Sequence, residues 1–251
     1  MTWHLAAAAV AGPHKQPEQG QDAVRTRLIR AQDQEILVLA LADGAGSAQH
    51  ARAAAQLIVK SLAAFTAERI RGRLRRGPQK TLWQEADTRA AMTYTRRQLH
   101  AEIQAQGHDR REWGSTALLA VLTADSTTLG QVGDGAMCVR QAGQWLLPLP
   151  VNLDAYVNVT PMLVDADAPV QVAQLAAVEA IVGFSDGLQP LAIDYATGQP
   201  FAPFCDGVIR ALDQALGRTL LEQHLRQWLA SPTVRARTDD DVSLLLASRQ
   251  G

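Results

Sequence analysis

An apolar run that ends in a carboxylate constrains the fold of this chain more than any other feature. Residues 37–42 are all apolar, Asp43 follows them directly, and Gly44 and Gly46 come next. A short apolar run bounded by turn residues predicts a buried strand. An aspartate at its end is held by a stiff element yet meets solvent, and glycines let a ligand approach the backbone. Taken alone, the stretch is more typical of an ordinary strand-to-helix turn whose polar residues cap the next helix.

Length and charge limit the function classes. The chain has 251 residues, 47% of them hydrophobic and 20% charged, and no linker-like segment divides it, so we expect a single domain over residues 1–251. The formal net charge of -1 argues against general nucleic-acid binding, so we expect no nucleic-acid partner. The basic cluster at residues 69–76 is interpreted as a solvated helix end, where cations suit the helix dipole.

Cysteine content and hydropathy bear on location. Cys138 and Cys205 lack metal-ligand spacing and are too few for a disulfide framework, so we interpret them as free thiols in a reducing cytoplasm. The apolar run at residues 5–11 has no Lys or Arg ahead of it and is shorter than the ~20 residues of a spanning helix. We therefore expect a cytoplasmic protein without a signal peptide or a membrane partner.

Hydrophobic periodicity predicts blocks of strands and blocks of helices. Strands are predicted at 3–12, 23–30, 36–41, 115–122, 127–132, 136–140, 145–147, 177–184 and 242–247. Helices are predicted from 48 into the basic cluster and at 82–104, 187–192, 201–216 and 220–230. For the second helix, the candidates for the buried face are Trp83, Ala86, Ala90, Tyr94 and Ile103. Short turns between consecutive strands favour antiparallel pairing, and the segregation indicates an α+β fold with helix-covered antiparallel sheets.

Aspartates recur where predicted strands begin or end. Asp22, Asp134, Asp186 and residues 239–241 share this position with Asp43. Several carboxylates that converge on one point cannot all stay ionised without a counter-charge, which a metal supplies. Oxygen ligands without Cys or His pairs predict a hard cation, Mg(II) or Mn(II). Because Mg(II) takes few carboxylates, a set of this size suits two ions better than one. Any one Asp–Gly pair is typical of a turn, so the prediction depends on the whole ordered set.

Six short motifs occur in a recognisable order. They are Gln21-Asp22 and residues 43–47, 114–116, 132–135, 184–188 and 240–243. Together they resemble the metal-dependent, type-2C (PPM) family of serine/threonine protein phosphatases, over residues 8–247. Gly12-Pro13-His14 and the segment from Asp154 to Thr160 are similar to a bacterial branch of that family. The resemblance implies a four-layer αββα sandwich, two antiparallel sheets flanked by helices, with a metal site at one end of the sheets.

The resemblance also implies roles for individual residues. Asp43 matches the aspartate that bridges both metals, and Gly44 matches a glycine whose backbone carbonyl ligates one of them. Asp186 and Asp240 match the two further ligands of the other metal. Asp22 matches an aspartate that usually acts through metal-bound water.

The implied activity is hydrolysis of phosphoserine and phosphothreonine in proteins by a water that two Mn(II) or Mg(II) ions activate. Phosphate-monoester hydrolysis is very slow without a catalyst, and two cations offset the charge of the dianion. Asp134 matches a position linked to a third metal or to support of the site. His14 is a candidate general acid or phosphate contact. The implied partner is a phosphorylated protein, the target of a kinase.

The chain departs from the family pattern at the phosphate contact. Most relatives carry an upstream arginine that clamps phosphate, whereas here His14 and Lys15 occupy the region, and a lysine acts as a point charge. Asp241 stands where Asn is more usual and adds negative charge near the metals. Residues 148–169 show no clear helix or strand pattern, so we expect a long irregular excursion from the sheets. Loops of this length in compact domains are often functional. Two alternatives stay open: a pseudophosphatase that binds a phosphorylated partner without turnover, and a phosphatase of small metabolites on the same fold.

Overall fold

Two antiparallel sheets form the centre of the computed structural model, which describes residues 2–31, 34–77, 81–151, 160–215 and 217–250. One five-stranded sheet has the order β1 (Thr2–Val10), β12 (Val242–Gln250), β9 (Ala180–Phe184), β6 (Ala136–Gln141) and β7 (Gln144–Leu146). The other has the order β2 (Ala23–Ala31), β3 (Gln34–Ala42), β4 (Ala117–Leu122), β5 (Ser126–Val132) and β8 (Gln171–Ala176). A small separate hairpin pairs β10 (Ile193–Asp194) with β11 (Gln199–Pro200).

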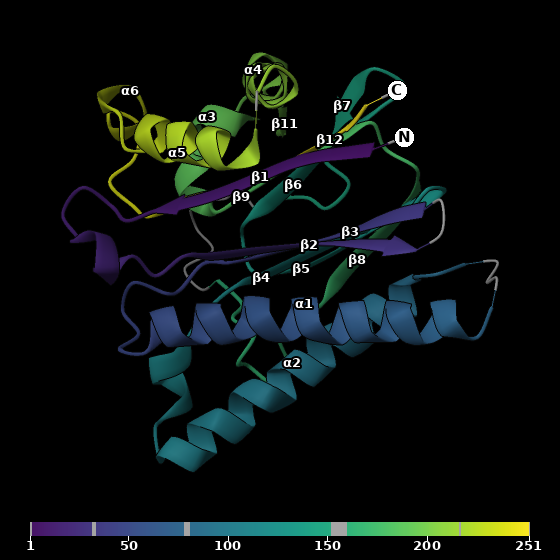
Figure 1. Ribbon diagram of the computed structural model, residues 1–251. Helices are drawn as coiled ribbons and strands as arrows, with labels where there is room; N and C mark the ends of the chain where they lie inside the picture. The colour runs from purple at the N-terminus through teal and green to yellow at the C-terminus, as the bar shows by residue number, and fades with distance from the viewer. Residues whose placement is uncertain (1, 32–33, 78–80, 152–159, 216, 251) are drawn as a thin grey trace.

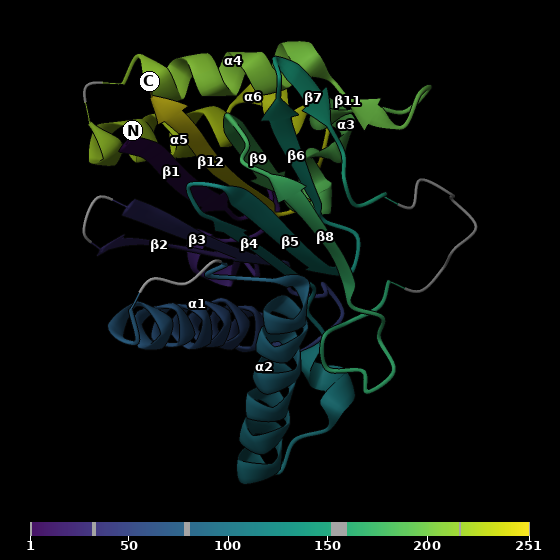
Figure 2. The ribbon, with the colours of Figure 1, turned by 90° about the vertical axis from the view of Figure 1, so that its right-hand side faces the viewer.

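Helices cover the outer face of each sheet, which makes four layers (Figures 1 and 2). α1 (Ala51–Arg75) and α2 (Glu85–Gln106) lie against the sheet that contains β3, and α4 (Ala202–Asp213) and α5 (Arg218–Leu229) lie against the sheet that contains β1. The short helices are η1 (Pro17–Gln19), η2 (Arg110–Trp113), η3 (Asp186–Leu188), α3 (Gln189–Ala192) and α6 (Pro232–Arg235). None of the described helices is long and apolar enough to cross a membrane. The arrangement confirms the predicted four-layer α+β sandwich.

β3 explains why the chain contains an uninterrupted apolar run before Asp43. Successive side chains of a strand point to opposite faces. Ile36 and Val38 join the core beneath α1 and α2, whereas Leu37 and Leu39 join the core between the two sheets. From Ile36 to Ala42 both faces of β3 are buried, so every position there is apolar, and Asp43 follows directly after the strand ends.

α2 buries the predicted face only in part: Ile103 is buried as predicted, and Ala90 is partly buried. Tyr94 is 39% exposed and Ala86 is also exposed, so the prediction was wrong at these positions. The buried residues of the helix are Asp87, Thr88, Ala91, Met92, Thr95, Leu99 and Ile103. Trp83 is buried as predicted, but it precedes the helix, which begins at Glu85. The predicted positions Ala86 and Tyr94 therefore lie off the face that the helix buries.

The basic cluster at the end of α1 contributes to helix packing. Arg69 Nε lies 2.7 Å from Asp87 Oδ1, and Arg73 Nη2 donates to the same oxygen at 2.9 Å. Asp87 belongs to α2, so the two arginines join the first helix to the second. The cluster lies at the end of α1 and most of its arginines are exposed, as interpreted, but Arg69 and Arg73 also form ion pairs with α2.

The predicted excursion is only partly described. Residues 152–159 lie outside the described residues, and with them most of the segment from Asp154 to Thr160 that resembles the bacterial branch. Thr160 to Pro169 are described and are irregular or in turns. β8 follows as an unpredicted edge strand that pairs with β5. Its half-exposed mixture of polar and small residues gave no clear strand pattern.

Candidate metal centre

Turns at one end of both sheets surround an acidic pocket of about 200 Å³. The pocket is lined by Asp43, Gly44, Ala45, Gly46, Thr116, Asp134, Thr160, Met162, Asp186 and Asp240. Asp43 follows β3 and Asp134 follows β5, whereas Asp186 follows β9 and Asp240 precedes β12. The fold therefore places carboxylates from both sheets around one pocket, which five of the residues that the sequence predicted as metal-binding line.

Thr116 fixes the backbone of Asp43. Its N–H donates to the carbonyl oxygen of Asp43 at 2.8 Å, and its Oγ1 accepts a 3.0 Å hydrogen bond from the Asp43 N–H. The neighbouring Gly44 forms an isolated bridge with Ser115. A Cβ at Gly44 would lie 2.9 Å from backbone and Cβ atoms of Ala51, so no larger residue fits without a shift. The motif at residues 114–116 is thus the structural partner of the Asp43 turn.

Asp22 lies beside Asp43 and contacts its side chain. Ser185 Oγ donates to Asp22 Oδ2 at 2.8 Å and accepts from the backbone N–H of Ser243 at 3.0 Å. Both serines were part of the quoted motifs, but sequence reasoning gave them no role. The sequence feature that could have identified them is a small hydroxyl residue next to both an apolar strand and an aspartate.

Crowding of the carboxylates raises their pKa values. Burial raises the pKa of Asp43 well above its ordinary value, and the charges of Asp22 and Asp186 raise it further. Burial also raises the pKa of Asp186, with a contribution from the charges of Asp134 and Asp240. The pKa of Asp22 is raised by burial to about 6, although the hydrogen bond from Ser185 lowers it. Each shift reflects negative charge that lacks a cationic partner.

The residues present fit divalent cations. Oδ1 of Asp22 and Oδ1 of Asp186 are buried without a hydrogen-bond partner in the described part of the chain. No Lys, Arg or His is among the described residues that line the pocket. Within the same ranges, no three His, Cys, Asp or Glu side chains lie close enough together to hold a metal ion among them. An open pocket of oxygen ligands suits Mg(II) or Mn(II), because Mg(II) binds one or two carboxylates and keeps several waters.

Two polar residues outside the predicted set hold Asp134 in place. Thr160 Oγ1 donates to Asp134 Oδ2 at 2.7 Å, and Gln189 Nε2 donates to its backbone carbonyl at 2.6 Å. Thr160 and Met162 reach the pocket from the excursion, whose length was the only sequence signal for them. Asp240 is exposed, and its Oδ1 accepts a 2.7 Å hydrogen bond from the N–H of Asp241.

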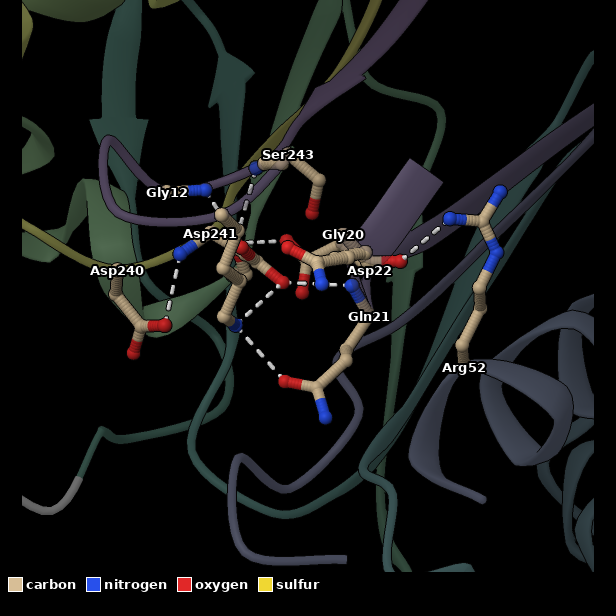
Figure 3. Close-up of polar contacts among 12 residues, drawn as sticks. Gly12, Gly20, Gln21, Asp22, Arg52, Asp240, Asp241 and Ser243 are labelled. Carbon is tan, nitrogen blue, oxygen red and sulfur yellow. Dashed lines mark hydrogen bonds and ion pairs between the residues drawn. The ribbon is translucent and has the colours of Figure 1, made fainter. Parts of the chain in front are cut away.

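His14 and Lys15 are not among the described residues that line the pocket. His14 is exposed in the turn after β1. Lys15 Nζ lies 3.0 Å from Asp241 Oδ2, and Asp241 is only 2% exposed. Figure 3 shows Asp241 between Gly12 and Gln21, close to Asp22. The charge of Asp241 adds to burial in raising the pKa of Asp22, as expected for negative charge near the site, but Lys15 balances part of it.

Comparisons with known proteins agree with this geometry. A family model described as "Protein phosphatase 2C" matches residues 14–230. The "Serine/threonine-protein phosphatase 3" of Escherichia coli (strain K12) is 31% identical over 257 residues, which cover 98% of each chain. Among solved structures, the serine/threonine phosphatase Stp1 from Staphylococcus aureus has a TM-score of 0.70 at 16% identity, over 100% of this chain and 96% of that one. The catalytic domain of the phosphatase PstP in complex with 2 manganese ions has a TM-score of 0.65 at 18% identity, over 98% and 97%.

Proposed function

The chain belongs to the protein phosphatase 2C family, and from this premise we propose that its acidic pocket hydrolyses phosphoserine and phosphothreonine in proteins with two Mn(II) or Mg(II) ions. One observation carries the proposal. Four carboxylates line a pocket that has no cationic side chain among its described residues. Such a pocket repels a phosphate dianion unless divalent cations occupy it. PstP, which shares the fold, was solved with 2 manganese ions.

The positions of the pocket residues support specific roles. Asp43 lies between Asp22 and Asp186 and would contact both ions. Gly44 would offer its backbone carbonyl to one ion, and Asp186 and Asp240 would hold the other. Asp22 contacts Asp43 and is not among the described residues that line the pocket, which suits contact with an ion through water.

When bound, the two ions would supply the positive charge that offsets the phosphate dianion and activates a water for attack. The chain's own residues would orient this chemistry. Thr116 holds the backbone of Asp43, and Thr160 and Gln189 hold Asp134, which would support the site or bind a third ion. His14 is exposed in the turn after β1 and stays a candidate for protonating the leaving group or for contacting phosphate.

Hydrolysis of a phosphothreonine peptide in Mn(II) tests the proposal. The wild-type protein should release phosphate, and Asp43→Asn should lose most of this activity. Asp167→Asn is the matched control, because Asp167 is exposed and does not line the pocket. Peptide binding without release of phosphate would indicate a pseudophosphatase. Activity on small phosphorylated metabolites alone would indicate a metabolite phosphatase.

The finer aspects of partner, location and domain structure belong to the same proposal. The substrate would be a protein phosphorylated by a kinase, and neither a nucleic acid nor a membrane would be needed. A reducing cytoplasm suits Cys138 and Cys205, which are buried free thiols. Residues 1–251 would act as one domain, because β1 and β12, from the two ends of the chain, pair along their whole length.

A further inference from the structure

The N-terminal loop (residues 11–22), which connects β1 to β2, is fastened to the turn that carries Asp240. Asp241 Oδ1 accepts a 2.7 Å hydrogen bond from the N–H of Gly12, and Oδ2 accepts one of 2.6 Å from the N–H of Gln21 (Figure 3). One carboxylate therefore holds both ends of the loop. Gln21 directly precedes Asp22, and Asp241 directly follows Asp240, so this contact sets two of the proposed metal-binding residues relative to each other.

Lys15 completes this contact. Its ammonium lies 3.0 Å from Asp241 Oδ2 and donates to Gln21 Oε1 at 2.8 Å. The side chain of Asp241 is 3% exposed, whereas that of Lys15 is 30% exposed. A buried carboxylate without a cation is costly, and Lys15 is the cation that pairs directly with Asp241, while the charge of Arg235 acts on it from further away.

Two arginines fasten the same loop from other elements. Arg235 Nη2 donates to the carbonyl of Ala11 at 2.5 Å, and its Nη1 donates to that of Asp240 at 2.9 Å. On the other side, Arg52 of α1 donates to the carbonyl of Gly20 at 3.2 Å (Figure 3). The loop is thus held between α1, below one sheet, and the turn that leads into β12 of the other.

We propose that Lys15 is a positioning residue that acts through Asp241, instead of a residue that binds the substrate phosphate. This inference depends on the proposed function only in its kinetic consequence. The ammonium neutralises Asp241, Asp241 holds the N–H groups of Gly12 and Gln21, and this geometry places Asp22 beside Asp43. To bind phosphate, Lys15 would have to break its ion pair with a buried carboxylate.

A charge-balanced double-mutant cycle tests the proposal. Lys15→Met removes the ion-pair partner of the buried Asp241 carboxylate. The urea midpoint of the metal-free protein should therefore fall. The backbone amides of Gly12 and Gln21 should exchange with solvent about tenfold faster or more. Asp241→Asn should lower the urea midpoint less than Lys15→Met does, because water can hydrate the partly exposed ammonium of Lys15. The double variant Lys15→Met/Asp241→Asn should regain much of the urea midpoint lost in Lys15→Met, because it buries no unpaired charge. Lys60→Met, an exposed site on α1, is the matched control and should leave all values unchanged.

Kinetics in Mn(II) separate positioning from phosphate binding. Positioning predicts that Lys15→Met lowers kcat about tenfold with little change in KM, and that Lys15→Arg, which keeps the charge, retains most of the activity and the amide protection. A higher KM with unchanged amide exchange and urea midpoint would overturn the proposal and assign Lys15 to the substrate. A double variant no more stable than Lys15→Met would also overturn it. If the wild-type protein hydrolyses no phosphopeptide, the proposed function fails, and the exchange and urea cycle still decides the role of Lys15.

Discussion

The hydroxyl of Ser185 donates a 2.8 Å hydrogen bond to Oδ2 of Asp22. The same hydroxyl accepts a 3.0 Å hydrogen bond from the N–H of Ser243, and Ser185 is fully buried. One small side chain therefore connects the end of β9, the start of β2 and the start of β12. These are the segments that carry Asp186, Asp22 and Asp240.

Removal of this hydroxyl should weaken both the fold and the site. We expect Ser185→Ala to lower the free energy of unfolding by ~1–3 kcal/mol, because the buried N–H of Ser243 loses its acceptor and Asp22 loses a donor. Phosphopeptide hydrolysis should fall about tenfold as Asp22 moves. Urea unfolding and a phosphate-release assay measure the two effects. Ser47→Ala, at an exposed position in the turn before α1, is the control, and equal behaviour of the two variants would refute the role of Ser185.

Gly44 should not tolerate a side chain. A Cβ there would lie 2.9 Å from atoms of Ala51, so Gly44→Ala should cost ~1–3 kcal/mol and displace the Asp43 turn, with a loss of Mn(II)-dependent activity. Gly46 lines the same pocket, but a Cβ added there would meet nothing within 4 Å, so Gly46→Ala should be close to wild type in stability. Urea midpoints of the two variants give the comparison. A Gly44→Ala protein as stable and active as Gly46→Ala would contradict the crowding argument.

The contact between α1 and α2 should make stability depend on acid pH. Burial raises the pKa of Asp87, but hydrogen bonds from Arg73 and Arg69 outweigh it and hold the pKa below its ordinary value. A pKa that is depressed in the folded state stabilises the fold above the unfolded pKa of about 3.9, and this stabilisation is lost as pH falls through the folded pKa. We therefore expect Asp87→Asn to be less stable than wild type at neutral pH, by an amount that shrinks below about pH 4. Urea unfolding from pH 7 to pH 3 measures this, with Asp167→Asn as the control. A deficit that stays constant or grows in acid would show that the ion pairs do not stabilise the fold.

The phase of α2 can be checked by truncating one residue on each face. Met92 is fully buried, so Met92→Ala should cost ~2–5 kcal/mol. Tyr94 is 39% exposed and stacks on Phe65 at 4.8 Å between ring centroids, so Tyr94→Ala should cost about 1 kcal/mol. Thermal or urea unfolding of the two variants measures which truncation destabilises the fold more. A larger loss for Tyr94→Ala would restore the face that periodicity predicted.

The sequence was most informative where local chemistry and burial coincide. β3 could be recognised because both of its faces are buried from Ile36 onward and the chain is apolar from there to Asp43. The pocket could be predicted because every carboxylate lies next to a strand end, a position that a strand pattern reveals. Asp43, Asp134, Asp186 and Asp240 all line it.

The sequence was least informative about contacts between distant segments. Arg69 and Asp87 are 18 positions apart on two different helices, and Lys15 and Asp241 lie near opposite ends of the chain, so no local spacing marks either pair. The prediction of the buried face of α2 was wrong at Ala86 and Tyr94, because Trp83, the first residue of that predicted face, is buried outside the helix. β8 escaped prediction because a half-exposed edge strand needs no clean alternation.

The central claim is that Asp43, Asp186 and Asp240 hold divalent cations in the acidic pocket. Anomalous diffraction from crystals soaked in Mn(II) tests it most directly. We expect two manganese peaks in the pocket of the wild-type protein and of Asp167→Asn, and the loss of at least one in Asp43→Asn. A map without a manganese peak between these three aspartates would contradict the claim.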